Sequence, residues 1–363
     1  MKLHNSGKGI WILNGLAIRI AQSLGLHREG EHLGLSPFQS EIRRRIWWHL
    51  LARDSRAAED YGLQRLCNLR SDAELPLNIE DPDLYEDLMA LPPPKPTFTS
   101  MTFPLVSCNI ARAVHELAGT LAASTSSDPP CESERRRILD QARQSVDVWL
   151  AYCNPVVPRQ KFALLTSRLA LRKADLVSRQ QWSAFKNADN YNVFPKDDDL
   201  LDVIEVLELV LQLRLDETLT PYSWMWNANP EYHGTMFLLW SLCIRPEGPH
   251  VERAWRVLNA LAESDEQITR PSGSMDAMLV ALKTKAEMAR AATHTRRSVE
   301  NARQTETSTP FFPASGEPYD FGDLWSHSGS NEWSPNLNDF SGWGSFLENF
   351  RLDTQEFPGM MYY

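Results

Sequence analysis

Apolar residues recur at helical spacing along almost the whole of this chain, and that periodicity constrains its fold more than any other feature. The segment GKGIWILNGLAIRIAQSLGLHREG places apolar residues three and four positions apart and stops at Gly25 and Gly30. No stretch alternates apolar and polar residues for long enough to predict a strand. The periodicity therefore predicts an all-α fold, an irregular set of helices joined by polar or proline-rich loops.

The second predicted helix has the clearest boundaries. Ser36 is its expected N-cap, Pro37 takes the first helical position, Gln39 completes a capping box and Gly62 ends the helix. A loop is predicted from residue 71 to about residue 100, because the prolines of LPPPKP fix φ and remove backbone donors. Further helices are predicted over residues 101–122, 132–153, 158–183, 198–220, 231–245, 249–264 and 273–295.

Charge and aromatic residues are unevenly distributed along the chain, whose net charge is −10. Residues 1–70 hold eleven Lys or Arg and six Asp or Glu, whereas residues 310–363 hold one Arg and eight acids. The latter segment also contains thirteen aromatic residues and few aliphatic ones. Mutual repulsion and the lack of aliphatic side chains oppose formation of a core there. We therefore predict a helical domain over residues 1–300 and a disordered acidic and aromatic tail over residues 301–363.

The segment EIRRRIWWHL, residues 41–50, sets three arginines beside two tryptophans. On a helical wheel, one apolar arc contains Ile42, Ile46, Trp47, Leu50 and Leu51. The other side holds Glu41, Arg44, Arg45, Trp48 and Arg56. Arg43 and Asp54 fall inside the apolar arc, so each needs a buried partner. Because successive arginines point in three directions, we predict a core helix with ion-paired arginines; direct nucleic-acid contact and a partner surface around Trp48 are the alternatives.

The sequence lacks the common motifs of enzymes. It has no G-x-x-x-x-G-K-[ST], no H-E-x-x-H and no G-x-S-x-G, and EDPDLYED lacks the glycine and terminal glutamate of a calcium loop. The five cysteines form no C-x-x-C pair, which is typical of reduced, buried thiols. We therefore expect no enzymatic activity, no catalytic residue and no metal site, and the sequence assigns no cofactor-binding residue. The uncharged runs are shorter than the roughly 20 residues that span a bilayer, so we expect no membrane insertion.

Several segments carry a family resemblance. GLAIRIAQSLGLHREGEHLGLSPFQSEIRRRIWWHLLARDSRAAEDYG and then LPLNIEDPDL resemble the middle homology region of fungal six-cysteine zinc cluster transcription factors, which show an L-G-L-H-R-D run, then R-R-R-L-W-W, then a P-x-N-x-x-D-x-D-L loop. The segment from VLELVLQLRLDETLTPYSWMWNANPEYHGT to the A-W helix resembles the family's final helices. The match runs from about Gly9 to about Ala292. The helix signature consists of Arg43, Arg44, Arg45, Trp47, Trp48 and Asp54.

The resemblance implies a transcription regulator located in the nucleus. Its helical region is expected to control activity, with a small metabolite as an effector, and its targets are expected among specialised-metabolite or nutrient-use genes. The family binds DNA through a C-x2-C-x6-C cluster that holds two zinc ions, and no such spacing occurs in these 363 residues. We expect no cofactor in this chain, with zinc bound only if a cluster lies upstream.

The missing cluster leaves two hypotheses. In the first, the chain is a zinc-cluster regulator shortened at its N-terminus, because it begins inside the homology region. In the second, it is a helical interaction or ligand-sensing protein, a corepressor or dimer partner that contacts DNA indirectly through a full-length regulator. A homodimer or a heterodimer is a candidate assembly, and the sequence does not indicate which state the chain adopts.

The tail offers a candidate contact for transcription coactivators. Within SGWGSFLENF, helical spacing i, i+3, i+4 and i+7 is shared by Trp343, Phe346, Leu347 and Phe350. Acidic residues interleaved with aromatics are typical of activation segments, because repulsion keeps the rings exposed for a coactivator groove. The alternative is an arm that packs its aromatic residues back on the domain without recruiting anything.

Overall fold

The computed structural model describes residues 7–61, 71–125, 127–186, 197–228, 231–264 and 274–306 of the 363-residue chain. The regular elements in these ranges are all helices and none is a strand, which confirms the predicted all-α class. In chain order the elements are α1 Gly7–Ser23, η1 Glu31–Leu33, α2 Pro37–Tyr61, η2 Asp81–Asp83, α3 Thr102–Ala123, α4 Glu132–Leu150, α5 Pro158–Lys186, α6 Asp197–Leu215, η3 Glu217–Tyr222, α7 Ser223–Ala228, α8 Tyr232–Ile244, α9 Val251–Ser264 and α11 Ser274–Glu306. None of the described helices is long and apolar enough to cross a membrane.

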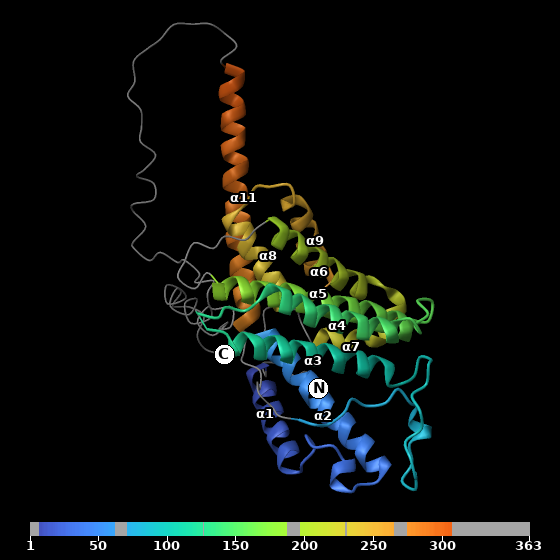
Figure 1. Cartoon of the computed structure of the whole chain (residues 1–363). Helices are drawn as coiled ribbons and strands as arrows, with labels where there is room; N and C mark the ends of the chain where they lie inside the picture. Colours follow the sequence, from blue (N-terminus) through green and yellow to red (C-terminus); the bar gives the residue numbers. More distant parts are fainter. Residues whose placement is uncertain are drawn as a thin grey trace.

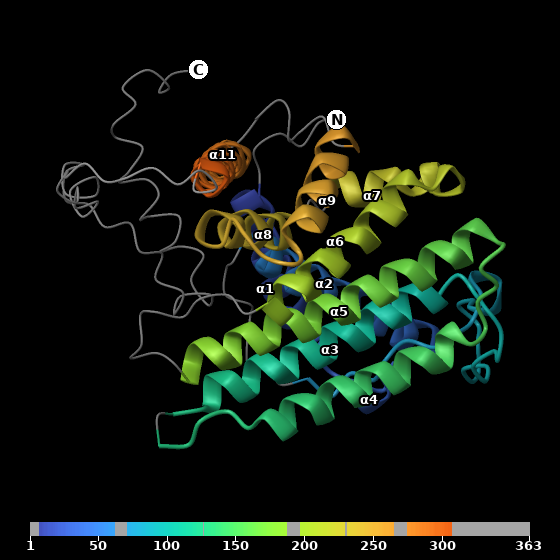
Figure 2. The ribbon, with the colours of Figure 1, turned by 90° about the horizontal axis from the view of Figure 1, so that it is seen from above.

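The helices form three layers (Figure 1). Helices α1 and α2 pack against each other on one side of the molecule, and α2 also packs on α3. Helices α3, α4 and α5 lie side by side as a three-helix bundle in the middle (Figure 2). Helices α6, α8, α9 and α11 form the opposite side.

The predicted boundaries of α1 and α2 are confirmed. After α1, Gly25 adopts φ 69°, a left-handed conformation that glycine favours and that commonly ends helices. At the start of α2, the Gln39 amide donates to Ser36 Oγ and the Ser36 amide donates to Gln39 Oε1, both at 3.3 Å. These reciprocal bonds are the capping box predicted from the sequence.

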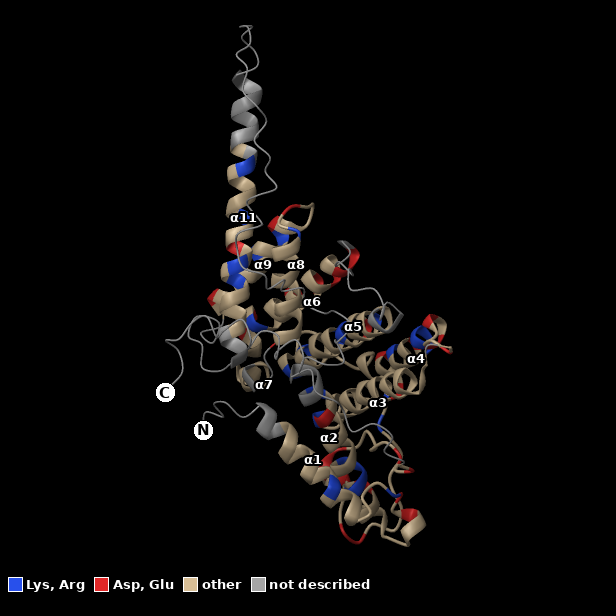
Figure 3. Ribbon diagram, turned by 90° about the vertical axis from the view of Figure 1, so that its left-hand side faces the viewer, with Lys and Arg blue, Asp and Glu red and all other residues tan. Residues whose placement is uncertain are grey.

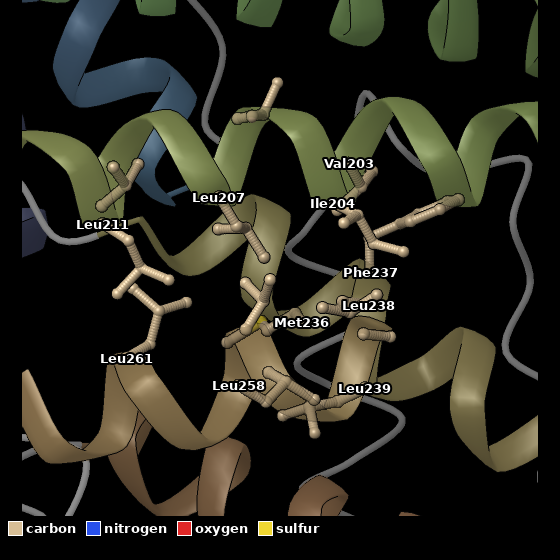
Figure 4. Packing of buried hydrophobic residues seen from close by; sticks show 14 of the residues in the cluster. Val203, Ile204, Leu207, Leu211, Met236, Phe237, Leu238, Leu239, Leu258 and Leu261 are labelled. Atoms are coloured by element: carbon tan, nitrogen blue, oxygen red, sulfur yellow. The ribbon is translucent and has the colours of Figure 1, made fainter. Parts of the chain in front are cut away.

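Helix α8 lies at the centre of the largest core cluster. It contains no Lys, Arg, Asp or Glu, and its residues from His233 to Leu242 are all buried. Figure 4 shows its Met236, Leu238 and Leu239 meeting side chains of α6 and α9. The contact with α6 is close, because a Cβ on Gly234 would lie 3.2 Å from Leu207 Cδ2. Because other helices enclose α8, apolar residues occur on every side of it and not along one stripe.

The long helix α11 packs with its first half only. The face that meets α8 comprises Met278, Leu279, Leu282 and Ala286, all buried. Arg290 lies over the Trp255 ring at 5.0 Å and pairs with Glu252 at 2.9 Å. Beyond Arg290 most described side chains are exposed, and the end of the helix projects from the body (Figure 1). The helix ends at Glu306, so the boundary expected at residue 300 lies inside its last turns.

The sequence did not predict every element. The helix expected over residues 198–220 ends at Leu215, and a 3-10 helix with Pro221 inside it continues to Tyr222. The break lies at Asp216, which has an extended backbone and whose Oδ1 accepts the Thr218 amide at 3.0 Å, so it caps a new helix and does not continue α6. The prediction of buried thiols is correct for Cys108 and wrong for Cys131, which is exposed in front of α4.

Candidate functional site

The predicted arginine–tryptophan segment lies within α2, which is covered by the α1–α2 turn and by the loop before α3. We call the side chains that join these three parts the polar clasp: Glu29, Glu41, Arg44, Arg45, Trp48, Glu74 and Asp81. All of them contact α2 or belong to it. The clasp therefore joins the three N-terminal motifs of the family resemblance.

Arg44 and Glu29 form the innermost pair of the clasp. Their side chains are only 7% and 4% exposed, and Arg44 Nη2 lies 2.9 Å from Glu29 Oε1. A second acid, Glu74, lies 3.1 Å from the same guanidinium. Glu29 also accepts the backbone amides of Gly30 and Glu74, each at 2.9 Å. A charge pair this deeply buried persists because its hydrogen-bonding groups are satisfied.

Arg45 points to the other side and forms a second pair. Its Nε lies 3.0 Å from Oε1 of Glu41, which has no exposed surface, and its Nη1 lies 2.8 Å from Asp81 Oδ1. Glu41 also accepts the backbone amide of Leu77 at 3.1 Å. The loop segment from residue 74 to 81 is thus tied to α2 by one ion pair at each end.

Arg43 differs from its two neighbours, because its partner is a backbone carbonyl. Its Nη2 donates to Leu24 O at 2.9 Å, just after the end of α1. Carbonyls at a helix C-terminus lack intrahelical donors, and a cation there also interacts favourably with the helix dipole. Arg43 therefore fixes the end of α1 on α2.

The two tryptophans are both inside. Trp47 has no exposed surface, and its ring lies 5.9 Å from that of His27. Trp48 is 8% exposed and its indole donates to Glu74 O at 2.8 Å. The alternative of a partner surface around Trp48 is therefore wrong.

The predicted orientation of the arc on α2 needs a correction. Ile46 is 44% exposed, whereas Glu41, Arg44 and Trp48 are buried. The helical wheel had placed Ile46 on the apolar side and Glu41, Arg44 and Trp48 on the polar side. The loop after α2 covers the polar side of the helix and supplies partners for its charges, which a pattern confined to α2 does not reveal.

The loop is itself held by Asn78, a residue that sequence reasoning did not single out. Asn78 is fully buried; its Nδ2 donates to the carbonyls of Lys95 and Thr97, and its Oδ1 accepts both threonine hydroxyls of Thr99 and Thr102. The resemblance to P-x-N-x-x-D-x-D-L was the signal for it. Asp83 of the same motif lies in a capping box with Glu80 and pairs with Lys95.

Asp54, the last signature residue, is 1% exposed and lies almost two turns beyond the tryptophans. Two residues further on, Arg56 lies 3.1 Å from Oε1 of Glu231, a residue just before α8. The same carboxylate lies 2.5 Å from Nζ of Lys173 on α5, which is 3% exposed. Lys173 and Glu231 were not predicted as partners. They link α2 to both the middle bundle and α8.

The two buried acids of the clasp differ in their pKa. Burial raises the pKa of Glu29, but hydrogen bonds from Arg44 and two backbone amides outweigh it, so the net pKa is lowered. Burial raises the pKa of Glu41 as well, and there the bonds from Arg45 and Leu77 offset only part of the effect. Glu29 is therefore favoured as a carboxylate, whereas ionised Glu41 is disfavoured.

The ion pairs of the clasp stabilise the domain. They also occupy the guanidinium groups that could otherwise bind phosphate. The guanidinium groups of Arg44 and Arg45 are each held between two carboxylates. In the described part of this end of the molecule, Lys and Arg positions lie among Asp and Glu positions along the ribbon (Figure 3). Within the described ranges, no three His, Cys, Asp or Glu side chains come together to hold a metal ion. The tail residues Trp343, Phe346, Leu347 and Phe350 lie outside the described residues.

A family model described as the fungal specific transcription factor domain matches residues 2–151, which include the whole clasp. Residues 2–151 are a fungal-specific transcription factor domain. The domain thus comprises α1 to α4, and its family of transcription factors is not enzymatic. Over residues 2–151, this match confirms the transcription factor domain suggested by the sequence.

Known relatives extend the similarity beyond the domain. The aurofusarin cluster transcription factor aurR2 of Gibberella zeae is 26% identical over 257 residues, 70% of this chain and 38% of that protein. The pyriculol/pyriculariol biosynthesis cluster transcription factor 1 of Pyricularia oryzae is 25% identical over 293 residues, 75% of this chain and 38% of that protein. The Zn(2)-C6 fungal-type transcription factor pigI of Monascus ruber is 38% identical over 89 residues, 24% of this chain and 11% of that protein. The chain therefore spans about two fifths of the length of the first two relatives, and no solved structure matches it.

Proposed function

We propose that this chain is a transcription regulator of fungal zinc-cluster type that controls a secondary-metabolite gene cluster. The observation that supports this most is the fungal-specific transcription factor domain at residues 2–151. Relatives that extend across about three quarters of the chain are named as regulators of biosynthetic clusters. Within such a regulator, the polar clasp holds the α1–α2 turn and the loop before α3 against α2.

We infer that DNA contact is made through a zinc cluster outside these 363 residues, on a partner chain or on a segment beyond the given sequence. The arginines of α2 that would suit phosphates are engaged with carboxylates. Zinc then belongs to that cluster, the assembly is nuclear, and a small metabolite is a candidate effector of the helical region.

Removing the gene from its fungus tests the regulatory role. We expect the transcripts of one group of neighbouring biosynthetic genes to change severalfold, while housekeeping transcripts stay constant. Chromatin immunoprecipitation of the tagged chain should recover the promoters of the same group. Unchanged transcripts under conditions that induce secondary metabolism, together with no promoter recovery, contradict the proposal.

A mobility-shift assay tests the indirect contact. Purified chain alone should leave the recovered promoter unshifted, and addition of a zinc-cluster protein that co-purifies with it should produce a shift containing both. A shift by the purified chain alone, retained after treatment with a zinc chelator, contradicts contact through a zinc-cluster partner.

We also propose that the acidic and aromatic tail recruits transcription coactivators through Trp343, Phe346, Leu347 and Phe350. Their spacing would place the four side chains on one face of a helix that forms on binding. Residues 310–363 fused to an unrelated DNA-binding domain should activate a reporter gene. Changing Trp343 and Phe346 to alanine should abolish most of that activity, whereas changing Trp325 and Trp333 should not; equal losses contradict the assignment.

A further inference from the structure

Helix α1 has a continuous apolar face that points away from the molecule. Along this face the exposed fractions are 61% for Ile12, 65% for Leu13, 57% for Leu16, 50% for Ile20 and 63% for Leu24. Leu13, Leu16, Ile20 and Leu24 recur every three or four residues and Ile12 directly precedes Leu13, so at about 100° per residue the five follow one side of the helix, with Leu24 just past its last residue. Large apolar side chains scattered singly are common on protein surfaces, but a contiguous row marks an interaction site.

The opposite side of α1 is already used. Ile18 and Ala21 are buried in the cluster with Trp47 and Leu51, and Asn14 Nδ2 donates to Leu50 O. Among the described helices the packing partner of α1 is α2. The apolar face is therefore available to a further element without any rearrangement of the domain.

Charge indicates which element fits. The sequence of α1, GKGIWILNGLAIRIAQS, contains a lysine and an arginine and no acid. A second copy of α1 would bring only like charges to this face, which oppose pairing. An element that is acidic and rich in large apolar side chains would be complementary in both respects.

The chain contains such an element in its own sequence. Residues 310–363 hold eight acids, one base and thirteen aromatic residues. Among them Trp343, Phe346, Leu347 and Phe350 have the spacing of a helix that packs on an apolar face. Asp339 and Glu348 place negative charge next to these rings.

The segment that connects α11 to Trp343 is long enough to bring Trp343 back to α1. Residues 307–342 separate the end of α11 from Trp343. Extended, 36 residues span up to about 120 Å, which exceeds the roughly 50 Å length of α11 itself. A tether of this length gives an effective concentration on the order of 1 mM.

We propose that residues 340–350 pack as a short amphipathic helix on the exposed face of α1 in the same chain, with Trp343 and Phe346 against Leu13 and Leu16. The contact covers the aromatic face that the tail would offer to any other protein. It does not rest on the tail being an activation segment, because a packing contact of this kind exists whether or not the tail recruits a coactivator.

Hydrogen–deuterium exchange on the intact 363-residue chain tests the contact. With a dissociation constant of about 0.1 mM, the tether keeps roughly nine chains in ten docked and slows exchange in α1 by about tenfold. Changing Trp343 and Phe346 to alanine should remove that protection from residues 7–23. The matched variant, with Trp325 and Trp333 changed to alanine, should keep it, and exchange in α4 should be the same in all three chains.

The reciprocal variant changes Leu13 and Leu16 to glutamine. Both side chains are more than half exposed, so the domain should keep its fold, and exchange should rise in residues 340–350. Each measurement is repeated at a tenfold lower protein concentration, where protection within one chain is unchanged. Protection that falls on dilution assigns the face to a second copy and overturns the proposal. Equal α1 exchange in the intact chain and the Trp343 and Phe346 variant, or equal increases in both tryptophan variants, also overturns it.

Discussion

The three consecutive arginines of α2 have three different sets of partners. Arg43 donates to a backbone carbonyl at the end of α1, whereas Arg44 and Arg45 each lie between one buried and one exposed acid, Glu29 with Glu74 and Glu41 with Asp81. Successive residues on a helix point about 100° apart, so one run of like charge reaches three neighbouring segments. The run therefore stabilises the domain from several sides.

Arg44→Ala should lower the free energy of unfolding by about 3–5 kcal/mol, because it leaves the buried Glu29 carboxylate without its cation. Arg53→Ala removes an exposed arginine from the same helix and should cost less than about 0.5 kcal/mol. Urea unfolding of the two variants measures the difference. Similar losses would show that burial of the Arg44 pair is not what stabilises the clasp.

Glu29 and Glu41 should respond to pH in opposite directions. The pKa of Glu29 is lowered in the folded state, so its stabilisation is present above the ordinary value of 4.5 and is lost as pH falls below it. The pKa of Glu41 is raised, so its contribution to stability is largest below 4.5 and declines as pH rises. The loss of stability caused by Glu29→Gln should therefore grow from pH 4 to pH 7, while that caused by Glu41→Gln shrinks. Urea unfolding at both pH values measures this, and slopes of the same sign would contradict it.

At the residue scale, the sequence predicted which residues take part in the packing of α2 but not the direction in which their side chains point. Arg43 to Arg45, Trp47, Trp48 and Asp54 all contribute to the packing of α2. The predicted orientation of these residues was partly wrong, because a loop about 30 residues downstream covers the charged side of the helix. A helical wheel treats charge as exposed, and it fails where partners come from elsewhere in the chain.

Among the elements, helices with local signals were predicted best. The capping box at Ser36 and the left-handed Gly25 are fixed by residues within one turn, so the sequence shows them directly. Helix α8 was predicted from its length and apolar run. Its contacts were not, because a helix that is apolar all round has no pattern to indicate its neighbours.

The close packing of α8 on α6 predicts a contrast between two helical glycines. Gly234→Val should destabilise the protein by about 1–3 kcal/mol, because its side chain would press on Leu207, already 3.2 Å from a Cβ. Gly119→Val places the same side chain on α3 where nothing lies within 4 Å, and it should be neutral or stabilising by about 0.5 kcal/mol. Thermal unfolding followed by circular dichroism compares them. A stable Gly234→Val protein would show that α6 and α8 are more loosely packed.

For the molecule as a whole, the last helix belongs to the core and not to the tail. Composition suggested a domain that ends near residue 300, but it did not show that α11 closes one side of α8. The contact joins residues about 40 positions apart, and apolar spacing on α11 alone does not reveal its partner. The family resemblance, in contrast, was visible from short motifs because each motif closes the same clasp.

Leu282→Ala tests the role of α11 in the core. Leu282 is 1% exposed between α11 and α8, so its truncation should cost about 2–5 kcal/mol of unfolding free energy. Met288→Ala, on the same helix and 67% exposed, should change stability by less than about 0.5 kcal/mol. Differential scanning calorimetry measures both, and equal melting temperatures would show that α11 is dispensable for the fold.

The enclosure of α8 has a consequence for synthesis. Its thirteen residues contain no Lys, Arg, Asp or Glu, and the last residue of the α11 face that covers it, Ala286, is made 42 residues after Ile244. At about 5–20 residues per second, this interval lasts roughly 2–8 s. During that time the nascent chain presents an uncharged apolar helix with one side open, so we expect residues 232–244 to be the segment most prone to aggregation during synthesis.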